Sequence, residues 1–130
     1  MMSPKSSAEE EAMSATTLLK RRDQMQRQPL ERCHDGKGSL DFVNVLGGVE
    51  IAGRALRFLH ADVLAPGVSI GAHRHDHEEY YYILSGRGTI TLDGQQVAVG
   101  PGDVTAVYPG GSHGLENTGT EDMRVIVVGL

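Results

Sequence analysis

Three side chains that can bind a metal lie close together near the middle of the chain: His73, His75 and Glu79. In an extended strand successive side chains point to opposite faces, so His73 and His75 share one face and Arg74 lies on the other. Residues 76–78 are polar and are predicted to form a turn. If the strand that begins at Glu79 pairs antiparallel with the strand that carries the histidines, the carboxylate faces the imidazoles across this turn. Imidazole and carboxylate ligands suit Mn, Fe, Co, Ni, Cu or Zn, and they discriminate poorly among these ions.

A fourth ligand must come from elsewhere in the chain, and His113 is the best candidate. The four residues together predict a site for one divalent transition metal. On an octahedral ion, four protein ligands leave two positions for water or substrate, which distinguishes a reactive site from a closed structural one. The alternative is a polar network of the same residues inside a barrel that holds no metal.

The spacing of these residues resembles the two motifs of the cupin family. The first motif, G-x5-H-x-H-x3-E-x6-G, runs here from Gly67 to Gly86. The second motif, G-x5-P-x-G-x2-H-x3-N, runs from Gly102 to Asn117. The resemblance covers about residues 42–130 and implies a small β-barrel, but it implies much less about the reaction. It also implies that one metal is held by three histidines and one glutamate, matched here by His73, His75, Glu79 and His113.

One position departs from the second motif, because Tyr108 stands where the family has proline and Pro109 follows immediately. The departure concerns the shape of the loop and leaves the ligand His113 in place. Gly102 and Gly110 are interpreted as turn glycines. Asn117 is interpreted as a residue of a turn or of a hydrogen-bond network.

Tyr81 lies two residues after Glu79, so it is predicted to point into the cavity beside the metal. Its hydroxyl could hydrogen-bond a substrate or act as a general acid or base, because a nearby metal lowers the pKa of a phenol. The alternative is a core aromatic residue whose hydroxyl has a partner. Tyr80 and Tyr82 alternate to the outer face, where they are expected to contact the N-terminal segment or a second subunit.

Arg57 is the candidate for substrate binding, since an inward guanidinium could clamp a carboxylate or phosphate with two hydrogen bonds. If it points outward, it is simply solvated. His77 lies outside the motif spacing and is interpreted as a solvated loop histidine. His34 and His60 have no ligand spacing and are interpreted as structural or surface residues.

The rhythm of the chain after residue 41 predicts an all-β fold. Glycine and proline turns separate short runs rich in apolar and β-branched residues, and Asp93-Gly94 between two such runs is a strong signal for a type I′ hairpin. Strands at intervals of about 8–12 residues favour a barrel or sandwich over a parallel α/β fold. With the resemblance, the expected architecture is an antiparallel double-stranded β-helix, the jelly-roll barrel of cupins. The expected strands span residues 42–46, 55–64, 68–75, 79–84, 89–92, 95–99, 104–108 and 123–128.

Residues 1–30 differ from the rest, because they lack glycine and are rich in Ala, Glu, Gln, Lys and Arg. Ser7 and Glu10 match a capping box, which predicts a helix from about Ala8 to Arg27. The apolar face of this helix is thin, so we expect an extension that is helical or disordered, or an arm that docks on a second subunit. The expected division is an N-terminal extension (1–30), a linker loop (31–41) and the barrel domain (42–130).

Composition bounds the partners and the compartment. The chain carries a net charge of −5 and its excess acidic residues lie after residue 30, so nucleic-acid binding is not expected. Cys33 is the only cysteine, which excludes an internal disulfide and favours the reducing cytoplasm. No stretch approaches the roughly 18 apolar residues of a membrane span, and the acidic residues 9–11 argue against a signal peptide.

We therefore expect a mononuclear metal-binding protein that acts as a small metalloenzyme on a polar organic acid or sugar derivative. The reaction could be that of a dioxygenase, isomerase, decarboxylase or lyase, because one fold supports many reactions. The alternative is a non-catalytic cupin that binds or senses a small ligand. We also expect a homodimer, because small barrels have exposed edge strands that must be covered.

Overall fold

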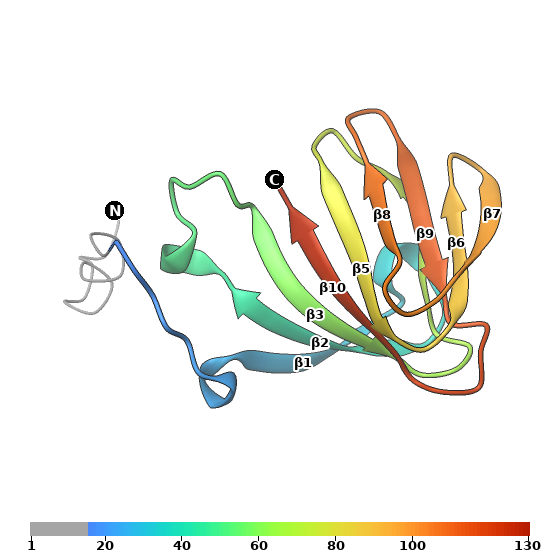
Figure 1. Cartoon of the computed structure of the whole chain (residues 1–130), viewed down its shortest axis with the longest axis horizontal. Helices are drawn as coiled ribbons and strands as arrows, with labels where there is room; N and C mark the ends of the chain where they lie inside the picture. The colour runs from blue at the N-terminus through green and yellow to red at the C-terminus, as the bar shows by residue number, and fades with distance from the viewer. Residues whose placement is uncertain (1–15) are drawn as a thin grey trace.

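The computed structural model describes residues 16–130, and this part of the chain folds into two antiparallel sheets without an α-helix. The first sheet has six strands in the order β1-β2-β3-β10-β5-β8, and the second has four in the order β4-β9-β6-β7. Figure 1 shows the two sheets curving toward one another, with β1 at the outer end of the first sheet. The all-β jelly-roll expectation is confirmed. None of the described residues belongs to a helix that is long and apolar enough to cross a membrane.

The strands lie close to their expected positions after residue 41. The first sheet consists of β1 (Gln26–Glu31), β2 (Ser39–Leu46), β3 (Phe58–Leu64), β5 (Glu79–Ser85), β8 (Val104–Val107) and β10 (Met123–Gly129). The second consists of β4 (Ser69–Arg74), β6 (Gly88–Leu92), β7 (Gln95–Val99) and β9 (Ser112–Glu116). Three single-turn 3-10 helices complete the described elements: η1 (Arg22–Gln24), η2 (Cys33–Asp35) and η3 (Gly48–Glu50).

The core lies between the sheets and follows the alternation of each strand. In β5 the residues Glu79, Tyr81 and Ile83 are buried, whereas the intervening side chains face outward. The buried apolar core includes Leu64, Ile83, Ile90, Leu115, Met123 and Val125. Tyr81 belongs to the same cluster and stacks on His113, so the apolar core extends to the polar side chains inside the barrel.

The hairpin between β6 and β7 confirms the Asp-Gly signal. Asp93 and Gly94 have φ values of +47° and +85°, and a type I′ turn requires positive φ at both of its central residues. Glycine adopts this backbone without strain, and aspartate tolerates it better than most other residues. The turn therefore sets the register in which Leu92 pairs with Gln95.

The strands before and after residues 76–78 do not pair with one another, although such a pairing was one way for the carboxylate to face the imidazoles. β4 pairs with β9 in the second sheet, whereas β5 pairs with β10 and β8 in the first. The chain between β4 and β5 therefore crosses from one sheet to the other. Sequence alternation identifies which side chains share a face, but it carries no information on which strand lies alongside.

The predicted N-terminal helix is wrong for the part of it that the structure describes. Residues 22–24 form the single turn η1, and strand β1 begins at Gln26. The portion of the predicted helix before residue 16 lies outside the described residues. β1 pairs with β2, so the first sheet begins before residue 42. Pro29 disguises β1 in the sequence, and it is tolerated because β1 is an edge strand whose outer side needs no ladder bonds.

Candidate metal centre

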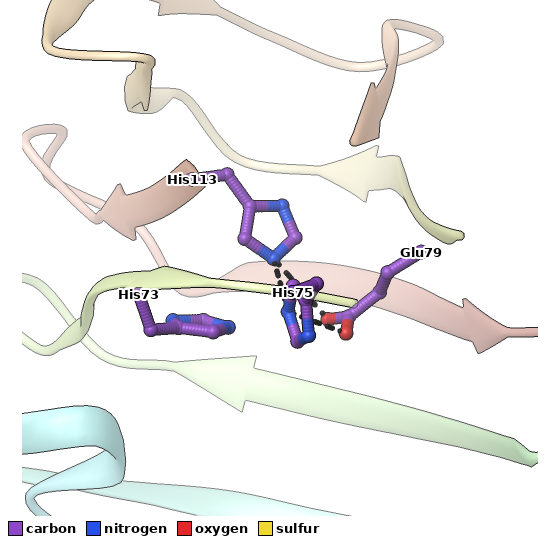
Figure 2. Close-up of side chains that lie close together, drawn as sticks. All are labelled: His73, His75, Glu79 and His113. Atoms are coloured by element: carbon purple, nitrogen blue, oxygen red, sulfur yellow. Dashed lines mark hydrogen bonds and ion pairs between the residues drawn. The ribbon is translucent and has the colours of Figure 1, made fainter. Parts of the chain in front are cut away.

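Both sheets supply the four predicted ligands. His73 on β4 and His113 on β9 are direct cross-strand partners in the second sheet. His75 lies one residue beyond the end of β4, and Glu79 begins β5 in the first sheet. Figure 2 shows the four side chains converging between the sheets. The carboxylate thus faces the imidazoles from the opposite sheet, and the crossing of the chain between β4 and β5 makes this possible.

The ligand atoms lie at separations that suit a single ion. His75 Nε2 is 2.7 Å from Glu79 Oε2 and 3.0 Å from His113 Nε2. His113 Nε2 is 3.4 Å from Glu79 Oε1. One atom from each of these residues and from His73 lies within 4.8 Å of all the others. Metal bonds of about 2.1 Å at right angles place neighbouring ligand atoms about 3 Å apart, so the group could hold a metal.

His73 gives a further sign that the group fits an ion. Its Nδ1 is 2.7 Å from the carbonyl oxygen of Gly71. A carbonyl only accepts, so Nδ1 carries the hydrogen and Nε2 of the neutral ring carries a lone pair. This Nε2 is buried and has no hydrogen-bond partner. Histidine ligands of metals generally donate their other ring N–H to an oxygen in this way.

The protonation states of the side chains at neutral pH also favour metal binding. Burial is the largest influence on His73 and lowers its pKa to about 4, despite the opposing hydrogen bond to Gly71. Burial likewise lowers the pKa of His75. For Glu79, burial acts to raise the pKa, but the hydrogen bond and charge of His113 and the charge of His75 outweigh it, so the pKa is lowered. At neutral pH these two imidazoles are neutral and the carboxylate is ionised, which are the forms that bind metals.

Tyr81 lies beside the ligands, on the inward face as predicted. Its ring stacks on that of His113 with centroids 4.3 Å apart, and its side chain is 1% exposed. Burial is the main cause that raises the pKa of Tyr81 well above its usual range, and the charge of Glu79 and a hydrogen bond to Glu79 raise it further. The phenol therefore keeps its proton at neutral pH in the metal-free chain.

His77 is placed differently from the prediction of a solvated loop histidine. Its side chain is only 13% exposed, and its Nε2 lies 3.7 Å from Glu79 Oε2. Its ring meets that of His75 edge-on, with centroids 4.6 Å apart. His73, His75, His77 and Glu79 occupy every second position of the chain. Continued alternation of side chains was therefore the signal that could have placed His77 inward. The bend at residues 76 and 77 does not turn the His77 side chain out to solvent.

The two remaining histidines line the same end of the barrel. His34 in η2 stacks on His73, with ring centroids 3.6 Å apart and an angle of 12° between the planes. His60 pairs through Nδ1 with Asp62 Oδ1 at 2.9 Å, and Asp62 is buried. Burial, opposed by His60, raises the pKa of Asp62. The interpretation of His34 and His60 as structural or surface residues did not foresee their closeness to the site, and Asp62 was not singled out.

Arg57 lies outside the ligand group. It is exposed and precedes β3, and its backbone N–H donates to the carbonyl oxygen of Gly129 at 2.7 Å. Its charge contributes to lowering the pKa of Asp76, after the hydrogen bond that Asp76 accepts from His77. A contact of the guanidinium with substrate stays a prediction.

Comparisons with known proteins agree with the fold and the motifs. A family model described as a cupin domain matches residues 62–129. The oxalate-binding protein of Thermotoga maritima is 32% identical over 114 residues, which cover 87% of this chain and 93% of the relative. An uncharacterised protein of Methanocaldococcus jannaschii is 37% identical over 68 residues, covering 51% of this chain and 54% of that protein.

Solved structures show the same similarity in three dimensions. The crystal structure of a predicted oxalate decarboxylase from Thermotoga maritima superposes with a TM-score of 0.80 at 31% identity, covering 87% of this chain and 98% of that one. The polyketide cyclase RemF from Streptomyces resistomycificus, at 20% identity and a TM-score of 0.69, covers 88% of this chain and 80% of its own and shares the fold alone. The family model, the relatives and the paired sheets lead to one conclusion: this chain belongs to the cupin family.

Proposed function

We propose that this chain holds one divalent transition metal through His73, His75, Glu79 and His113 and binds a small dicarboxylate of the oxalate type at that metal. The observation that carries the proposal is the convergence of three imidazoles and one carboxylate within 4.8 Å. The buried, unpartnered Nε2 of His73 supports it, because a metal would satisfy that atom. The name of the Thermotoga relative, which covers most of both chains, supports the choice of ligand.

The metal, when bound, would supply a Lewis-acidic centre with open positions for two ligand oxygens. The chain's own residues prepare that centre. Glu79 and His113 hold their ligand atoms 3.4 Å apart from opposite sheets, and Gly71 orients His73 through its carbonyl oxygen. Tyr81 donates its hydroxyl hydrogen to Glu79 and packs flat on His113, so it fixes the positions of two ligands.

The test is calorimetric titration of metal-loaded protein with oxalate, malonate, succinate and acetate. We expect oxalate to bind most tightly, because its two carboxylates are adjacent and can occupy two neighbouring positions on one ion. The longer diacids and the monoacid are expected to bind at least about tenfold more weakly, a difference of about 1.4 kcal/mol. Equal affinity for all four acids, or unchanged oxalate binding after metal removal, would refute the proposal.

The Tyr81→Phe variant distinguishes a catalytic site from one that only binds the acid. If the site is catalytic, we propose that it decarboxylates the bound acid, in keeping with the description of the similar crystal structure as a predicted oxalate decarboxylase. If Tyr81→Phe keeps oxalate affinity but loses formation of formate and CO2, the enzyme hypothesis is supported. If the wild type forms no product and only affinity falls in the variant, the alternative of a non-catalytic binding protein is supported.

We also propose that the chain forms a homodimer through the outer face of the first sheet. Tyr82 on β5 and Val104 on β8 are cross-strand partners, and they are 45% and 63% exposed. Leu84 and Tyr108 extend this apolar surface, and they are exposed as well. Apolar patches of this kind commonly mark contacts between proteins.

Light scattering is expected to give the mass of a dimer for the wild type and of a monomer for Tyr82→Lys/Val104→Lys. The two lysines would lie in the centre of an apolar contact and would lose their water without gaining an anionic partner, which disfavours association. Val97→Lys on β7 is the matched control, since it also places a charge at an exposed apolar position but in the other sheet. A wild type that remains monomeric at a protein concentration of about 100 μM, at which even a weak dimer would form, would refute the proposal that this surface is a dimer contact.

A further inference from the structure

We infer that His77 supplies a fourth imidazole to the metal centre through its Nε2 atom, an inference that rests on the metal site proposed above. His77 occupies a variable position of the first motif, between His75 and Glu79, and comes from the loop between β4 and β5. Its side chain nevertheless points toward the ligand group, because its Nε2 lies 3.7 Å from Glu79 Oε2. This Nε2 is buried and has no hydrogen-bond partner.

The hydrogen bond at the other ring nitrogen defines the state of this atom. His77 Nδ1 lies 3.1 Å from Asp76 Oδ1. An ionised carboxylate only accepts hydrogen bonds, so Nδ1 carries the hydrogen, and Nε2 is the nitrogen that a metal can bind. The same arrangement holds at His73, where Gly71 accepts from Nδ1 and Nε2 is left free. His73 and His77 are therefore prepared in the same way, with an oxygen behind the ring and a free nitrogen in front.

The Nε2 atom of His77 faces the carboxylate of Glu79. When Nε2 carries no hydrogen, its lone pair and a carboxylate oxygen 3.7 Å away repel, and burial removes the water that would otherwise separate them. A cation between the two atoms converts the repulsion into two bonds. Around an ion with bonds of about 2.1 Å, neighbouring ligands lie about 3 Å apart and opposite ligands about 4.2 Å apart, so the observed separation falls within the range for one coordination sphere.

Aromatic packing holds the imidazole in this position. The ring of Phe58 meets the ring of His77 edge-on, with centroids 5.7 Å apart. Phe58 itself lies over Gly129, where an added Cβ would come within 2.4 Å of the phenyl ring. The ring of His75 contacts His77 from another direction. These contacts restrict the ring, so Nε2 is presented toward Glu79 without the freedom of a solvated loop side chain.

A fourth imidazole changes the character of the site. The donor set becomes four nitrogens and one carboxylate, and imidazole-rich sets suit Zn, Cu, Fe and Ni better than Mn or Mg. On an octahedral ion only one position then remains open. A diacid that needs two adjacent positions must displace one ligand, and His77 is the candidate because it does not occupy one of the fixed positions of the motifs. His77 is thus the exchangeable member of the set.

The test counts nitrogen ligands in the Cu(II)-loaded full chain by pulsed electron paramagnetic resonance and measures Zn(II) affinity by competition with a chelator. We expect four coupled imidazoles in the wild type and three in His77→Ala and in His77→Gln, which keeps more of the side-chain volume. Zinc affinity should fall about 10- to 100-fold in both variants. Asp76→Ala should keep four imidazoles and lose less affinity, because it removes only the acceptor behind the ring.

The matched control is His34→Ala, which removes an exposed imidazole that stacks on His73 and is not one of the four predicted ligands. It should keep the wild-type nitrogen count and affinity. The inference is overturned if His77→Ala and His77→Gln match this control in both measurements while His75→Ala loses the metal. If His75→Ala also binds metal as the wild type does, the proposed metal site fails together with this inference.

Discussion

The double substitution His75→Ala/His113→Ala is expected to abolish stoichiometric metal binding. The two imidazole nitrogens lie 3.0 Å apart and both approach the carboxylate of Glu79, so their loss removes half of the four-residue set at once. Elemental analysis of untagged protein should give about one equivalent of metal per chain for the wild type and a small fraction of that for the variant. The identity of the ion would then direct assays toward O2 chemistry for iron and toward lyase, isomerase or decarboxylase reactions for Zn, Mn or Ni.

The loss of the metal should also appear in thermal unfolding. A ligand present at 1,000 times its Kd stabilises the folded state by about 4 kcal/mol, which for a chain of this size corresponds to a Tm increase of about 15 °C. Adding metal should therefore raise the Tm of the wild type but leave the double variant unchanged. His34→Ala is the control, since it alters the same end of the barrel outside the four ligands. Wild-type protein that takes up none of the divalent ions would favour the polar network over the metal site.

Asn117→Ala is expected to destabilise the fold by about 3 kcal/mol through the loss of a buried hydrogen-bond hub. The side-chain amide donates to the carbonyl oxygens of Leu64 at 2.8 Å and Glu121 at 2.7 Å. Its Oδ1 accepts from the N–H of Gly119 at 2.9 Å. Asn117 is 1% exposed and its bond to Leu64 is buried, so truncation leaves at least that carbonyl oxygen without a partner. The side chain links the end of β3 to the loop before β10, and its loss leaves several backbone groups unpaired.

Urea unfolding at constant pH measures this effect as a shift of the midpoint at an unchanged slope. Thr118→Ala is a matched control one residue away. Its hydroxyl bonds the hydroxyl of Thr89 at the exposed surface, so a change of less than about 0.5 kcal/mol is expected. An Asn117→Ala variant as stable as Thr118→Ala would show that the hub is not a major source of stability. The metal stoichiometry of Asn117→Ala should remain that of the wild type, because the residue contacts none of the four ligands.

The group of side chains that could hold a metal and the all-β architecture were readable from the sequence for a clear reason. Alternation places His73 and His75 on one face and Glu79 and Tyr81 on one face, since the side-chain period of a strand does not depend on its neighbours. The Asp93-Gly94 turn was readable because few residue pairs tolerate positive φ at two successive positions. Asn117 was correctly interpreted as a network residue, although its partners were unknown.

The partnerships between distant segments could not be read from the sequence, because no local pattern encodes them. β4 and β5 lie in different sheets, so Glu79 reaches the imidazoles from across the barrel. β1 was not predicted as a strand, because its polar sequence with Pro29 has little intrinsic strand preference, and pairing with β2 overrides that preference. The inward position of His77 and the stacking of His34 on His73 arise from loops packed against the ligand strands. Local spacing thus set which residues could bind a metal, whereas long-range strand pairing and loop packing set which side chains surround them.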